Sequence, residues 1–146
     1  HIEWPIVIML AAMIPIGQAL ESTGITALIA TEVVSLAGDL HIFWVLMIIL
    51  IITMLITDVI NNAATAVIMA PFSVNIALQL GQPLEPFLMV VAVGASCAFL
   101  TPIGHQCNTL VMGPGNYKFS DYWRLGLPLD ILIVLASIPM ILFVWL

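Results

Sequence analysis

Two clusters of polar residues interrupt an otherwise apolar sequence, at residues 57–65 and 101–108. Carbonyl, amide and hydroxyl oxygens in such clusters are hard ligands that suit a small cation. Each cluster has an asparagine just ahead of an apolar run, Asn62 and Asn108. Asparagine is a strong helix N-cap, and the positive end of a helix attracts anions. We therefore expect a cation and an anion to bind where the two clusters meet.

The composition indicates the environment in which such a site operates. Of the 146 residues, 63% are hydrophobic and 7% are charged, and the mean hydropathy is +1.24. Soluble domains carry roughly a quarter charged residues, so we expect an all-α membrane protein. Two basic against eight acidic residues exclude a nucleic-acid surface. The chain begins with histidine, and we interpret it as a piece of a larger membrane protein.

The apolar runs predict the elements that must position the clusters. We expect a transmembrane helix at 4–20, an interfacial helix at 25–36, a re-entrant helical hairpin at 42–80, a discontinuous helix at 86–112 and a last transmembrane helix at 127–146. The hairpin is inferred because no charged loop separates its two runs. A single bent helix and a hairpin that spans the membrane twice are the alternatives. Irregular backbone at membrane depth must be buried in protein or line an aqueous cavity.

Five further residues could ionise or react. Asp58 stands in an apolar run and is either a functional ionisable group or a paired structural one. Asp130 is expected at the interface, near a helix end. His105 either binds substrate or a proton, or caps a helix, whereas Cys97 and Cys107 are expected to be small packing residues.

The sequence lacks the usual catalytic motifs. It contains no His-Glu-x-x-His zinc motif, no Gly-x-Ser-x-Gly nucleophile turn and no Gly-x-x-x-x-Gly-Lys phosphate loop. We therefore expect a protein that is not an enzyme.

Several motifs, in the right order, resemble one family. The stretch Thr57-Asp58-Val59-Ile60-Asn61-Asn62-Ala63-Ala64-Thr65-Ala66 is similar to the hairpin tip of the divalent anion:sodium symporters, the SLC13-type permeases of the ion transporter superfamily. The stretch Ala95-Ser96-Cys97-Ala98-Phe99-Leu100-Thr101-Pro102 resembles their broken helix, and Gly126-Leu127-Pro128 is also familiar from them. The likeness covers nearly the whole chain and corresponds to the second, C-terminal inverted repeat of the transporter.

The resemblance implies a sodium site built from both clusters. The residues carried over are Thr57, Ile60, Asn62, Gly104 and Asn108. Three of them, Thr57, Ile60 and Gly104, would serve largely through backbone oxygens.

The anion, by the same resemblance, would face Asn62, Ala63 and His105. The family's Ser-Asn-Thr has become Asn61-Asn62-Ala63, and its Thr-Pro-Pro-Asn now reads His-Gln-Cys-Asn over residues 105–108. These departures leave the anion open between sulfate and a dicarboxylate.

The resemblance implies sodium-coupled symport of a small anion by alternating access. Its partners would be the anion, the missing N-terminal half, membrane lipid and a second copy in a homodimer, in a bacterial inner membrane. One alternative is a proton-coupled exchanger or arsenite-type permease of the same superfold, in which Asp58 and His105 titrate. A membrane scaffold fragment without transport activity, or an intramembrane enzyme, is the alternative from another class.

Overall fold

The computed structural model describes residues 15, 19, 22–24, 31 and 41–146. The helices expected at 4–20 and 25–36 lie outside the described residues. Within the described part every regular element is a helix, which confirms the all-α expectation. The elements are α3 (Ile42–Thr57), α4 (Asn62–Leu80), α5 (Leu84–Ala95), α6 (Gln106–Met112) and α7 (Phe119–Trp145).

The helices α3 and α4 form a tight hairpin joined by residues 58–61, which we call the hairpin turn. Asn61 has an extended backbone, with φ −64° and ψ 156°, and its Oδ1 accepts the Ala64 N–H at 2.8 Å. The N-cap of α4 is therefore Asn61, whereas the sequence assigned that role to Asn62, which is the first helical residue. One bent helix through this interval is excluded, because α3 ends at Thr57.

Residues 96–105 interrupt the second pair of helices, and we call them the break. The helix α5 ends at Ala95, earlier than the sequence predicted, and α6 starts after His105. His105 Nδ1 accepts the Cys107 N–H at 3.2 Å and so caps α6. Asn108, expected to be the cap, lies inside α6. Histidine is a less common cap than asparagine, so residue preferences misplaced this boundary.

The helix α7 begins at Phe119, ahead of the start expected at residue 127. Its first turn is stabilised by Asp121, whose carboxylate accepts the Lys118 N–H at 2.8 Å. The helix therefore includes Arg124, and Pro128 lies in its interior. Asp130 consequently lies near the middle of α7 and not near its end.

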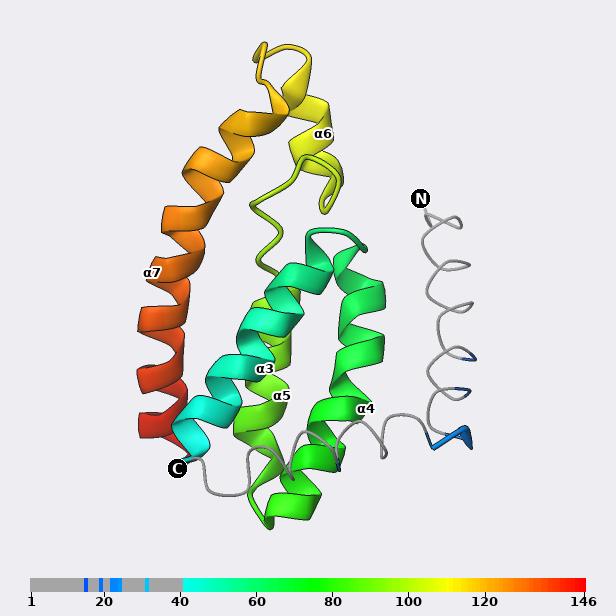
Figure 1. Cartoon of the computed structure of the whole chain (residues 1–146), viewed down its shortest axis with the longest axis vertical. Coiled ribbons are helices and arrows are strands. Elements are labelled where there is room, and N and C mark those ends of the chain that lie inside the picture. Colours follow the sequence, from blue (N-terminus) through cyan, green and yellow to red (C-terminus); the bar gives the residue numbers. More distant parts are fainter. Residues whose placement is uncertain (1–14, 16–18, 20–21, 25–30, 32–40) are drawn as a thin grey trace, which may run out of the picture.

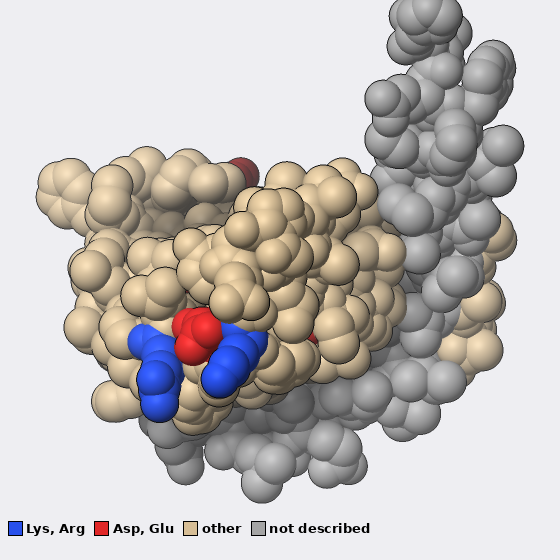
Figure 2. Space-filling model, turned by 90° about the horizontal axis from the view of Figure 1, so that it is seen from above, with Lys and Arg blue, Asp and Glu red and all other residues tan. Residues whose placement is uncertain are grey.

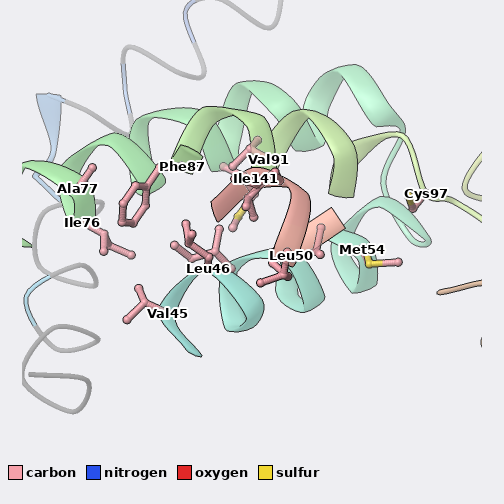
Figure 3. Close-up of a cluster of buried hydrophobic side chains, with 14 residues drawn as sticks. Val45, Leu46, Leu50, Met54, Ile76, Ala77, Phe87, Val91, Cys97 and Ile141 are labelled. Carbon is pink, nitrogen blue, oxygen red and sulfur yellow. The ribbon is translucent and has the colours of Figure 1, made fainter. Parts of the chain in front are cut away.

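A hydrophobic core joins four of the helices (Figure 3). It includes Leu46 and Leu50 from α3, Ile76 from α4, Phe87 from α5 and Ile141 from α7, all almost fully buried. The crossing of α3 and α5 is close, because a Cβ on Gly94 would lie 2.8 Å from Thr53 Cβ. This core holds the hairpin, α5 and α7 together as one bundle.

The hairpin turn does not reach the end of the bundle. In Figure 1 the turn lies part-way along α7, and α6 lies beyond the turn on the same side as the start of α7. The break runs past the turn to reach α6. The two polar clusters of the sequence are thus brought to the same level of the structure.

Candidate ion and anion site

Hydrogen bonds join the end of α3 and the hairpin turn to the end of α5 and the break. The Thr57 hydroxyl, fully buried at the end of α3, lies 2.9 Å from the Ala95 carbonyl oxygen. Asp58 Oδ1 accepts the Leu100 N–H at 2.9 Å. The Asp58 carbonyl oxygen accepts the hydroxyl hydrogen of Thr101. Residues some forty positions apart in sequence therefore form one polar junction.

Gly104 brings the break into contact with the end of α3. A Cβ on Gly104 would lie 2.7 Å from the Thr57 carbonyl oxygen and 3.0 Å from Asp58 Cα. Real Cβ atoms are essentially never so close to another heavy atom, so only glycine fits without movement. Two residues that the resemblance assigned to the sodium site, Thr57 and Gly104, are therefore adjacent.

Asn62 joins the same group through Thr57, whose hydroxyl oxygen lies 3.0 Å from Asn62 Oδ1. A threonine hydroxyl has one hydrogen to donate, so it cannot satisfy both Ala95 and Asn62 at once. If that hydrogen goes to Ala95, the Asn62 amide turns its Nδ2 towards Thr57, and its oxygen becomes free for a ligand.

The donor chemistry of this junction fits a small hard cation. In the described part of the chain, no hydrogen bond ends on the carbonyl oxygens of Thr57, Ile60 or Gly104. The described residues also contain no cluster of three His, Cys, Asp or Glu that would suit a transition metal. The oxygens at the junction belong to carbonyl, hydroxyl and amide groups and to the Asp58 carboxylate, and all of these are ligands for sodium-like or calcium-like ions.

The other expected ligands have no contact with Thr57 or Gly104 among the described hydrogen bonds. The Asn108 amide donates to the carbonyls of Ala98, at 2.7 Å, and Thr101, at 3.1 Å, so this side chain shapes the break. Ile60 is partly exposed, 39% of its maximum, in the hairpin turn. Ala63 lies half-buried in the first turn of α4. No described hydrogen bond joins Asn62 to Asn108, so a shared ligand between them stays a prediction.

His105 has a structural role that the sequence left open. Because its Nδ1 accepts the Cys107 N–H, this imidazole is neutral at Nδ1 and has its Nε2–H available as a donor. The histidine is half-buried at the boundary of the break and α6. Capping the helix and donating to an anion are thus compatible uses of its two nitrogens.

Two cavities border the junction. One, of about 750 Å³, is lined by Asp58 and Thr101 from the junction and by Lys118 and Trp123 from the start of α7. The other, of about 300 Å³, is apolar apart from Asp130 and lies between α3 and α7. Asp58 Oδ2 and Asp130 Oδ1 are buried and have no hydrogen-bond partner among the described residues.

The positive charge of the chain lies at the same end. Lys118 and Arg124 are its two basic residues. Seen from the end where α7 begins, Lys and Arg side chains lie on either side of an acidic one (Figure 2). Of these two residues only Lys118 lines the larger cavity, which also contains the Asp58 side chain in its wall.

The helix α7 supports α6 at one point and the break at another, and the sequence did not reveal either contact. The Tyr122 hydroxyl donates to the Asn108 carbonyl oxygen at 2.7 Å. A Cβ on Gly126 would lie 2.5 Å from the Phe99 carbonyl oxygen, so α7 packs directly on the break. The only signal was the Gly126-Leu127-Pro128 motif, which gives no contact by itself.

Comparison with known proteins identifies the family. The whole chain, residues 1–146, matches the citrate transporter family. It is 37% identical over 144 residues to an uncharacterized transporter of Synechocystis, covering 99% of this chain and 24% of that protein. It is 40% identical over 140 residues to the uncharacterized transporter YfbS of Escherichia coli, covering 96% of this chain and 23% of that protein.

A relative that is named for its substrate is more distant. Sodium/sulfate cotransporter 2 of Chlamydomonas reinhardtii is 28% identical over 137 residues, covering 93% of this chain and 16% of that protein. The chain spans slightly less than a quarter of the length of the Synechocystis and Escherichia coli relatives. The relatives are transporters and not enzymes, and they agree with the resemblance to divalent anion:sodium symporters. The chain belongs to the citrate transporter family of integral membrane proteins.

Proposed function

We propose that this chain is the part of a secondary transporter that carries a sodium site and one side of an anion site. The observation that carries the proposal is the junction of the hairpin turn with the break. There the free carbonyl oxygens of Thr57, Ile60 and Gly104 accompany the Asn62 amide. A bound sodium ion would supply positive charge next to the anion.

The length of α3 favours a re-entrant hairpin, whereas α4 and α7 are both long and apolar enough to cross a membrane. The 16 residues of α3 measure about 24 Å at roughly 1.5 Å per residue, less than the roughly 30 Å of a bilayer core. The 27 residues of α7 measure roughly 40 Å, enough to cross with some tilt. Since the hairpin turn lies part-way along α7, it would lie within the membrane when α7 spans it.

The anion would meet Asn62 and Ala63 on the hairpin side and His105 on the other side. Sulfate is our first candidate because relatives are named sodium/sulfate cotransporters, with a dicarboxylate second. A neutral His105 offers one Nε2–H donor to either anion. Lys118, in the wall of the larger cavity, would favour the arrival of anions from that side.

The length of the relatives points to a further part of the transporter beyond this chain. The first half of the transporter would supply the opposite part of the site. Exposed apolar side chains of α7, among them Leu125, Leu135 and Phe143, would contact that half, lipid or a second copy in a homodimer. We place the complete protein in a bacterial inner membrane. Alternating access would move the hairpin and the break together, because the junction binds them.

Asn62→Leu tests this function in the full-length protein reconstituted in liposomes. The substitution removes the amide from the proposed site and should abolish uptake of labelled sulfate and succinate driven by a sodium gradient. Asn75→Leu is the matched control: it lies in the same helix, and its amide donates to Pro71 O, four residues earlier, at 2.9 Å.

The control should retain most of the uptake, and both variants should reconstitute to the same level. Sodium-dependent uptake that survives Asn62→Leu would refute the assignment. Uptake that follows a proton gradient and ignores sodium would favour the proton-coupled alternative.

A further inference from the structure

The hydroxyl of Thr101 uses every hydrogen bond that a hydroxyl can make. It donates its one hydrogen to the Asp58 carbonyl oxygen. It accepts the N–H groups of Ile103, at 3.2 Å, and Gly104, at 3.1 Å. A hydroxyl has one donor and two acceptor positions, so this one is saturated without water or ligand.

One of these bonds joins the break to the hairpin turn, and the other two lie within the break and fix its shape. Asp58 belongs to the hairpin turn, and Ile103 and Gly104 belong to the break. The Thr101 carbonyl oxygen also accepts the Asn108 amide at 3.1 Å, which ties α6 to the same residue. Thr101 is therefore the point where the hairpin turn, the break and α6 are connected.

The position of Gly104 depends directly on this hydroxyl. Gly104 lies so close to the Thr57 carbonyl that a Cβ would be 2.7 Å from it. The Gly104 N–H that Thr101 accepts fixes the orientation of the peptide group before Gly104. Without that bond the break can move away from α3 by small rotations of its backbone, and the proposed oxygen ligands would separate.

We propose that Thr101 is a positioning residue that sets the geometry of the cation site, an inference that rests on the proposed function. Thr101 contacts neither ion in this account. It acts by holding the Gly104 backbone against the end of α3. Its loss should therefore weaken the dependence of transport on sodium more than the affinity for the anion.

The test is the isosteric variant Thr101→Val in the full-length protein, with sulfate as the anion. The sodium concentration for half-maximal uptake should rise about five- to ten-fold, because the substitution removes three hydrogen bonds of the hydroxyl and part of that loss falls on the cation site. The half-saturating sulfate concentration, measured at saturating sodium, should change less than two-fold. Thr101→Ser keeps the hydroxyl and should restore the wild-type sodium dependence.

The matched control is Thr53→Val, the same change at a threonine that is buried inside α3. The Thr53 hydroxyl donates only to the Ile49 carbonyl oxygen of its own helix, at 2.7 Å. The control should leave both half-saturating concentrations unchanged. If Thr101→Val does not reconstitute, Thr101→Cys replaces it: its thiol is a weak hydrogen-bonding group, and it should raise the half-saturating sodium concentration about three-fold.

The inference is overturned if the valine variant, or the cysteine variant in its place, keeps the wild-type sodium dependence. It is also overturned if sodium and sulfate dependence shift equally, if Thr101→Ser fails to rescue, or if Thr53→Val has the same effect. A wild-type protein whose uptake ignores sodium would instead refute the proposed function. The two failures are thus told apart by the wild-type measurement.

Discussion

Individual residues at the junction of the hairpin turn and the break have roles that their types alone do not reveal. Asn61 and Asn62 are adjacent and identical, yet one caps α4 and the other reaches Thr57. The sequence predicted an asparagine cap here, but the predicted residue was Asn62 and the actual cap is Asn61. The difference depends on the backbone of residue 61, which is extended, and residue type does not encode that choice.

Gly104→Ala should impair sodium coupling because the alanine side chain would collide with the end of α3. The added Cβ would meet the Thr57 carbonyl oxygen at 2.7 Å and Ala98 Cβ at 2.9 Å. The break must then move away from α3, so the half-saturating sodium concentration should rise several-fold, as measured by uptake against sodium concentration. Gly113→Ala is the control, because a Cβ there has nothing within 4 Å. Equal behaviour of the two variants would show that the close approach at Gly104 has no functional consequence.

Among the elements that the structure describes, apolar runs predicted the helices well, and their ends less well. The runs around residues 42–57 and 62–80 gave a hairpin, because a hydrophobic run continues as a helix until polar residues compete for the backbone. The end of α5 was misplaced, and a tertiary contact holds the chain that follows it: Asp58 accepts the Leu100 N–H. The start of α6 was misplaced because His105, and not an asparagine, caps it. The start of α7 was missed because Asp121 caps a stretch that contains both basic residues.

Asn61→Ala should lower the stability of the hairpin by about 1 kcal/mol, the usual cost of losing an N-cap. The Ala64 N–H would lose its side-chain partner, and α4 would fray at its first turn. Thermal unfolding of the purified full-length protein measures the effect, and Asn61→Asp or Asn61→Ser should restore most of the stability. A midpoint unchanged by Asn61→Ala would contradict the assignment of the cap.

Taken as a whole, the fold brings the hairpin turn and the break next to each other part-way along α7. Core residues such as Leu46, Phe87 and Ile141 hold α3, α5 and α7 in register. Gly126 then lets α7 press on the break. The family and the all-α class followed from the sequence, because composition and several ordered motifs agree. Contacts such as that of Thr101 with Asp58 could not be predicted from the sequence, because pairing across some forty residues leaves no local pattern.

Coupling of transport to sodium at this junction is tested by the uptake of labelled sulfate by the full-length protein in liposomes, with a sodium gradient and with an equal potassium gradient. A sodium site at the junction predicts concentrative uptake with sodium, little uptake with potassium, and loss of the sodium effect in Asn62→Leu. Sulfate uptake that is equal in sodium and potassium would contradict sodium coupling at this junction.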